Sequence, residues 1–193
     1  MRIARFTGIA MLLLVPIVLS GCSLLGLGGP LPLCADPAVK LYVQKANDIN
    51  SSTLQAANRM GELLSRLQND PSLIDNSTWK SAVDDQVQKI VTDNQKVQNL
   101  RLPRKELGVF HQLLIGAFQN YADGVQTIEE GLNEKDTSKI LSGVDTLSLS
   151  DNKLKGARDE LSSILGDCPW FSSNLSLGLI QKSAPATRLR LRL

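Results

Sequence analysis

The sequence contains few residues with which a catalytic or metal site could be built. It has one histidine, three cysteines and three methionines, and it has no CxxC pair, CxxCH haem-attachment motif or zinc-ligand cluster. The Glu-x-x-His pairs of di-iron helical proteins, the Gly-x-Ser-x-Gly elbow of hydrolases and the glycine-rich phosphate loop are also missing. We therefore expect a protein that is not an enzyme, with no catalytic residue, no metal and no cofactor.

The first 21 residues are typical of a secretory signal peptide. Arg2 and Arg5 precede an uncharged run over residues 6–19, which is shorter than the roughly 20 residues of a comfortable membrane span. Small residues follow, as a signal peptidase requires. We expect this segment to be removed.

The four residues Leu19-Ser20-Gly21-Cys22 resemble the lipobox of bacterial lipoproteins. The resemblance implies cleavage between Gly21 and Cys22 and attachment of a diacylglycerol to Cys22, and two or more acyl chains hold a soluble domain stably at a bilayer. Ser23 is consistent with the outer membrane of a cell with two membranes, because aspartate at this place favours retention in the inner one. In a cell with one membrane, the protein would lie on its outer face. The resemblance implies nothing about activity.

Charge is distributed unevenly along the chain. The formal net charge of +2 comes from Arg2 and Arg5, so the remainder is formally neutral. Four basic residues and no acidic ones lie in the last twelve positions, which leaves residues 22–181 mildly acidic. Such a body has no basic face for nucleic acid, and nucleic acid is not an expected partner.

Two cysteines remain once Cys22 carries lipid. Cys34 and Cys168 form an even pair in a chain exported to an oxidising compartment, so the sequence predicts a disulfide bond between them.

Four stretches between residues 36 and 168 have the three- and four-residue spacing of apolar positions that is typical of packed helices. The first begins at Asp36-Pro37, an N-cap followed by proline, and ends in a loop over residues 68–76. The second runs from about Ser77 to Pro103, and the third begins at Pro103. Asp136 caps the fourth helix, and Gly166 ends it. The predicted core positions are Val39, Tyr42, Ala46, Ile49, Thr53, Ala56, Met60, Leu63 and Leu67; Trp79, Val83, Val87, Ile90, Asn94 and Val97; Leu107, Phe110, Leu114, Ala117, Tyr121, Val125, Ile128 and Leu132; Ile140, Val144, Leu147, Leu154, Leu161 and Leu165.

The cysteines decide how these helices are arranged. Cys34 precedes the first helix and Cys168 follows the last, and a disulfide requires about 6 Å between their Cα atoms. Only an even number of antiparallel helices brings both to the same end. The sequence therefore predicts an all-α, up-down-up-down four-helix bundle over residues 36–168, preceded by a lipidated tether over residues 22–35.

The only histidine, His111, and Met60 are the available haem ligands. In the predicted bundle they differ by roughly 22 Å along the helix axes, too far to share one iron. We expect His111 to be a surface or boundary residue beside Phe110.

Several polar residues fall on the predicted helices. The adjacent carboxylates Asp84-Asp85 and Glu129-Glu130 are expected to splay around their helices towards solvent. A second set lies near the middles of the four helices and could form one polar layer, which would either fix the register of the bundle or line a small-ligand cavity. These residues are Thr53, Asn94, Tyr121 and Asp151.

Residues 169–193 form an irregular tail, first apolar and then basic, which we expect to be flexible. Its last six residues alternate arginine and leucine, from Arg188 to Leu193, which would place the charges on one face of an extended strand. Such a face suits an anionic membrane, a glycan or a partner.

Together these features favour a lipid-anchored, non-enzymatic helical bundle at the cell envelope that acts as an interaction or structural module. Its expected partners are the membrane, through the anchor, and another protein or envelope component. The alternative is a small-ligand-binding module with its site in the bundle core, which would require a sizeable internal cavity. Neither the oligomeric state nor the identity of a partner follows from the sequence.

Overall fold

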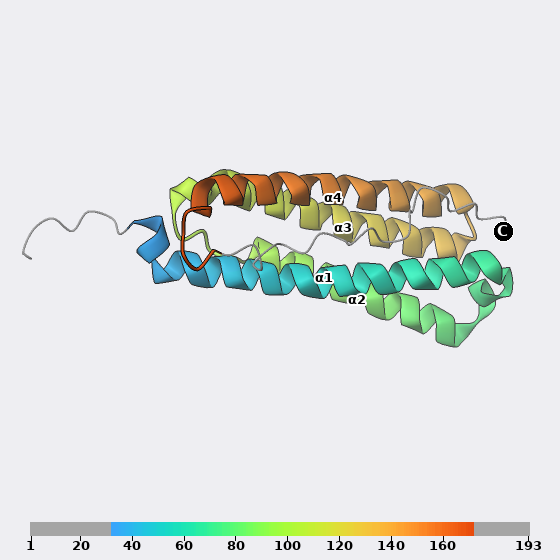
Figure 1. Ribbon diagram of the computed structural model, residues 1–193. Coiled ribbons are helices and arrows are strands. Elements are labelled where there is room, and N and C mark those ends of the chain that lie inside the picture. Colours follow the sequence, from blue (N-terminus) through green and yellow to red (C-terminus); the bar gives the residue numbers. More distant parts are fainter. Residues whose placement is uncertain (1–31, 172–193) are drawn as a thin grey trace, which may run out of the picture. The chain divides into compact units, whose positions relative to one another are not determined.

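The computed structural model describes residues 32–171. This part of the chain contains four long helices and no strand, which confirms the predicted all-α class (Figure 1). The helices are α1 (Pro37–Asn69), α2 (Ser77–Gln98), α3 (Gly108–Glu134) and α4 (Thr137–Leu165), and three short 3-10 helices accompany them: η1 (Leu33–Ala35), η2 (Pro71–Asp75) and η3 (Lys105–Leu107). The predicted signal peptide, the lipobox with Cys22 and the basic tail segment lie outside the described residues.

Short polar side chains begin three of the helices. Oδ1 of Asp36 accepts a hydrogen bond from the backbone N–H of Ala38 at 2.9 Å, and Pro37 occupies the first helical position, as predicted. Asp136 caps α4 in the same way, also as predicted, and Asn76 caps α2. Gly166 follows α4 with φ of −56°, so it ends the helix without the left-handed conformation that favours glycine there.

The predicted start of the third helix at Pro103 is wrong. The helix α2 ends at Gln98, and α3 begins only at Gly108, after the turn η3. The reason lies at Arg104, whose backbone is extended and whose guanidinium lies 3.3 Å from Oδ2 of Asp36. This ion pair to the start of α1 holds residues 99–107 in a separate connection.

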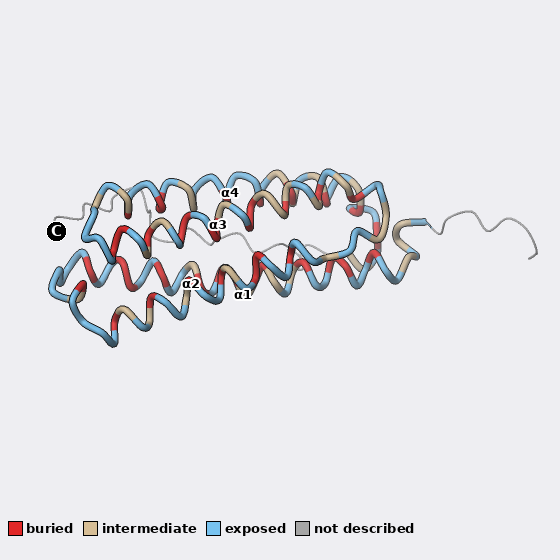
Figure 2. Tube along the Cα trace, turned by 180° about the vertical axis from the view of Figure 1, so that it is seen from behind, coloured by how far each residue is buried: buried red, intermediate tan, exposed pale blue. Residues whose placement is uncertain are grey.

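The four helices lie side by side, and their buried positions face one another (Figures 1 and 2). The pair α3 and α4 makes the most extensive contact, while α2 packs against both α1 and α3. The predicted apolar positions are buried, except that Ile49 and Leu147 are only partly buried. The neighbour of Ile49, Asn50, is fully buried instead.

Glycines explain why α3 and α4 approach so closely. A Cβ atom built on Gly143 would lie 2.6 Å from the carbonyl oxygen of Gly124 and from Cγ1 of Ile128. On Gly124 it would lie 2.9 Å from the carbonyl oxygen of Gly143. Only hydrogen fits between the two backbones at this crossing.

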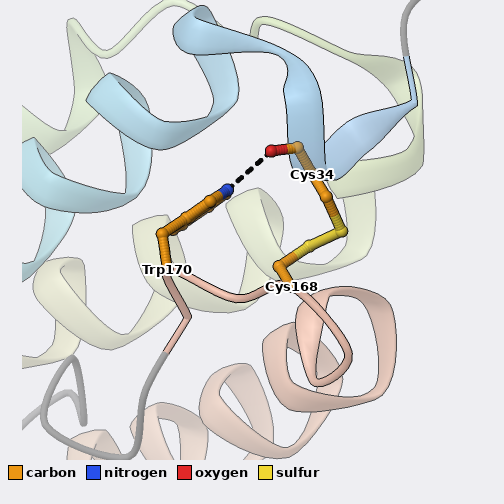
Figure 3. The surroundings of a disulfide bond; sticks show 3 residues. All are labelled: Cys34, Cys168 and Trp170. Atoms are coloured by element: carbon orange, nitrogen blue, oxygen red, sulfur yellow. Dashed lines mark hydrogen bonds between the residues drawn. A yellow bond between two sulfur atoms is a disulfide. The ribbon is translucent and has the colours of Figure 1, made fainter.

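Cys34 and Cys168 are joined by a disulfide bond, with their Cα atoms 5.1 Å apart, as predicted. The indole N–H of Trp170 donates a hydrogen bond of 2.7 Å to the carbonyl oxygen of Cys34, beside the bond (Figure 3). Trp170 and Phe171 also pack against the core. The first residues of the expected tail therefore contact the helical body, and they fasten the segment before α1 to the segment after α4.

We predict that Cys34→Ser will strongly lower the melting temperature. The disulfide closes a loop of 134 residues, and in the chain-entropy model such a loop stabilises the folded state by about 4–5 kcal/mol. Differential scanning calorimetry of Cys34→Ser and of the double variant Cys34→Ser/Cys168→Ser should give similar losses. Cys168 should become open to alkylation on unfolding. A melting curve unchanged from that of the native protein would contradict a stabilising role.

Gly143→Ala should destabilise the protein by about 1–3 kcal/mol, because the added methyl group collides with backbone and core atoms of α3. Gly61→Ala is the matched control. Gly61 is exposed on α1 and has no atom within 4 Å of an added Cβ, so alanine there should stabilise the helix by about 0.5–1 kcal/mol. Chemical denaturation of both variants measures the difference, and equal effects would argue against the close crossing.

Candidate functional site

Five polar or charged residues are buried among the described residues, and they lie on α1, α2 and α4. Oγ1 of Thr53 donates a hydrogen bond of 3.1 Å to Oδ2 of Asp93, and Nζ of Lys96 lies 2.6 Å from Oδ1 of the same carboxylate. Asp93 is fully buried, whereas Lys96 reaches it from a side chain that remains about half exposed. Both carboxylate oxygens therefore have a donor, which buried charge requires. The five are Asn50, Thr53, Asp93, Asn94 and Ser150.

The structure does not join the four residues of the predicted polar layer into one network. Thr53 bonds to Asp93, a residue outside the predicted layer. Tyr121 is buried and its hydroxyl donates a bond of 2.6 Å to Asp151, which is exposed. Burial raises the pKa of Tyr121, and the charge of Asp151 raises it further.

Asn94, the remaining member of the predicted layer, forms its hydrogen bonds with residues outside the layer. Its side-chain amide bonds to Gln98 of its own helix and to Gln119 of α3, in a group of amides that reaches the surface. Of the four residues of the predicted polar layer, only Tyr121 and Asp151 are thus hydrogen-bonded to each other.

Asn50 is the least satisfied residue of the core. Its side chain is completely buried on α1, yet neither its Oδ1 nor its Nδ2 has a hydrogen-bond partner among the described residues. A buried polar group without a partner costs about 1–3 kcal/mol. Periodicity did not identify Asn50, because the three- and four-residue spacing placed its neighbour Ile49 in the core instead.

His111 is held by a tyrosine. The hydroxyl of Tyr42, on α1, lies 2.7 Å from Nδ1 of His111, on α3. This distance is that of a hydrogen bond, and the imidazole tautomer decides which of the two atoms donates. Burial lowers the pKa of His111 and raises that of Tyr42. His111 is partly buried and next to Phe110, as expected, and its role in the structure is to join two helices.

One member of each acidic pair faces the other pair; Asp84, Asp85 and Glu130 are exposed as expected, and only Glu129 is partly buried. Asp84 of α2 interacts with Glu129 of α3, and burial together with the charge of Asp84 raises the pKa of Glu129. Both line a cavity of about 10 Å³ with Trp79, whose indole N–H is buried without a partner among the described residues. This volume suits a single water molecule, which could bridge the indole and a carboxyl group.

The larger hollow is an open groove of about 490 Å³ between α1 and α2. Lys45, Asp48 and Ile49 line it from α1, and α2 contributes Thr92, Gln95 and Lys96, with Asn99 and Leu100 beyond its end. Most of these side chains are exposed. The groove holds mixed charge and no cluster of nucleophile and base, so it offers contact area rather than a reaction centre.

Within residues 32–171, no three histidine, cysteine, aspartate or glutamate side chains are grouped so that they could hold a metal ion. No helix in this part of the chain is long and apolar enough to cross a membrane.

Comparison with known proteins found no match. No family model, curated protein or solved structure matches this chain.

We predict that acidification destabilises the protein through His111. Because the pKa of this imidazole is lowered on folding, the unfolded chain binds the proton more readily, and stability falls as the pH falls through the ordinary value near 6.5. Between about pH 7.5 and about pH 5.5, the melting temperature of the native protein should fall more than that of His111→Gln. Carboxyl groups titrate in both proteins and cancel in the comparison. Parallel melting temperatures over this range would contradict the prediction.

Proposed function

We propose that this protein is a lipid-anchored, non-enzymatic helical module of the cell envelope, held at the membrane through Cys22 and acting by contact with a protein or envelope component. The observation that supports it is the disulfide of Cys34, which is twelve positions after Cys22 in the sequence. A lipid on Cys22 would hold the whole helical body by this one covalently closed end. The sides of the helices would then be available for partners.

The proposal includes an up-down-up-down antiparallel bundle. Three contacts support this arrangement. Tyr42 near the start of α1 meets His111 near the start of α3, and the disulfide joins the segments before α1 and after α4. Lys135, between α3 and α4, forms an ion pair of 2.9 Å with Asp75, between α1 and α2. Such contacts are expected when successive helices run in opposite directions.

The interior of the described part supports an interaction or structural module more than a small-ligand-binding module. Its core is filled with apolar side chains, among them Phe110, Phe118 and Leu114, and the larger groove opens to the surface. Interaction through exposed helix faces requires no internal cavity. This is the reason to prefer the interaction module over the ligand-binding module.

The anchor can be tested by intact mass spectrometry of the protein extracted from its own membrane. We expect a chain that begins at Cys22, carries the mass of attached acyl groups, and lacks two hydrogens for the disulfide. Cys22→Ala should abolish the lipid mass and release the protein from the membrane fraction, while Cys34→Ser should keep the lipid. An unlipidated chain that still begins at Met1 would refute the proposal.

Asn50 favours a second candidate, the binding of a small polar ligand in the core, because its buried amide lacks a partner among the described residues. Native mass spectrometry of the same sample separates the two functions. A stoichiometric small mass that disappears on denaturation, and that is lost in Asn50→Leu, would favour ligand binding. Bare protein or a protein complex would favour the interaction module.

A further inference from the structure

One end of the helical body brings together segments that are distant in the sequence. The disulfide and the bond from Trp170 to Cys34 fasten the segment before α1 to the segment after α4. Arg104, in the connection between α2 and α3, forms ion pairs with Asp36 at 3.3 Å and with Glu106 at 3.2 Å. This disulfide end therefore includes the first turns of α1 and α3 and the whole of residues 99–107.

The disulfide end exposes apolar side chains that the core does not use. Leu41 is 51% exposed, Leu102 39% and Val109 57%, and they are three of the five large apolar residues that are exposed in the described part of the chain. Leu41 lies in the second turn of α1, Leu102 in the connection and Val109 at the start of α3. These three residues fall outside the periodic positions whose side chains are buried in the core.

Cations accompany these apolar side chains. Lys40 precedes Leu41, Arg101 precedes Leu102, and Lys105 begins the turn η3; all three are exposed. Acidic residues lie at the same end as well: Asp36 and Glu106 pair with Arg104, Asp167 is exposed, and Asp159 and Glu160 lie in the last two turns of α4. Exposed leucine or valine next to lysine or arginine is the composition that binds the interface of an anionic bilayer. We call the set Lys40, Leu41, Arg101, Leu102, Lys105 and Val109 the basal surface.

We propose that the basal surface docks on a bilayer that contains anionic lipids, with the cations at the headgroups and the apolar side chains in the interface. The inference rests on the proposed anchor, because Cys34 is twelve positions after Cys22, which limits the disulfide to about 40 Å from a lipidated Cys22. Of all the body's surfaces, the disulfide end is thus the one tethered nearest to the lipid.

The sequence after Cys168 carries further positive charge. Lys182, Arg188, Arg190 and Arg192 follow Cys168 without an intervening acidic residue. They come after Trp170 and Phe171 in the sequence, and these two residues pack at the disulfide end. An acyl anchor becomes much more stable when a polybasic segment binds the same membrane.

The protein's two tryptophans provide the test. Trp170 lies at the disulfide end, whereas Trp79 lies in the first turn of α2, roughly 28 Å along the helix from Gln98. Trp79→Phe leaves Trp170 as the single reporter, and Trp170→Phe leaves Trp79. Each lipidated full chain, checked by mass, is reconstituted into vesicles that carry a nitroxide quencher on their headgroups. One set contains phosphatidylcholine alone, and the other also contains phosphatidylglycerol.

We expect phosphatidylglycerol to increase the quenching of Trp170 and to leave Trp79 unchanged. Arg101→Gln/Lys105→Gln should lower the ratio of docked to undocked protein by roughly one order of magnitude. The matched control Arg66→Gln/Lys89→Gln removes the same charge from exposed positions outside the basal surface and should have little effect. High salt should reverse the docking.

Quenching of Trp170 that is equal in the two kinds of vesicle, or equal in the native protein and Arg101→Gln/Lys105→Gln, would overturn the proposal. Amide hydrogen exchange over residues 99–109 of the native protein gives a second measure that needs no tryptophan substitution; phosphatidylglycerol should slow it. If mass spectrometry shows no lipid, the proposed anchor fails. Charge-dependent quenching of Trp170 would then still support the basal surface, so the two failures can be told apart.

Discussion

The bond between Cys34 and Cys168 is the constraint on which the rest of the structure depends. It joins positions 134 residues apart, and so requires the chain to leave and return to one place. The proposed up-down arrangement of four helices with short connections would satisfy this requirement. Trp170 adds a hydrogen bond at the same place, which removes freedom from the segment after α4. The closure brings the segments before α1 and after α4 together at the disulfide end.

The helices within this closed loop are held by different kinds of contact. Gly124 and Gly143 let the backbones of α3 and α4 approach until no side chain fits between them. The helices α1 and α2 are joined by larger side chains and by the buried bond of Thr53 to Asp93. Asn50 adds a destabilising contribution that the apolar core must offset. A close, apolar pair and a more polar pair thus share one core.

Much of the fold could be predicted from the sequence because it depends on local rules. The spacing of apolar residues identified the buried faces, and Asp36 and Asp136 marked helix starts through their capping oxygens. The start of α3 was misplaced because an ion pair between distant residues, Arg104 and Asp36, decides it. The candidate sites were harder to predict for the same reason. A sequence pattern does not tell which residue of a neighbouring helix meets Asp84 or Thr53.

The closure at the disulfide end also determines how the molecule responds to force. The proposed membrane anchor and a bound partner would pull on the protein from opposite sides. Tension applied between the chain before Cys34 and the chain after Cys168 passes through a covalent bond and does not reach α1, α2, α3 or α4. The helices would experience tension only if the partner were bound to their sides. Reduction of this one bond would place all four helices in series with the load, and the body would then become extensible.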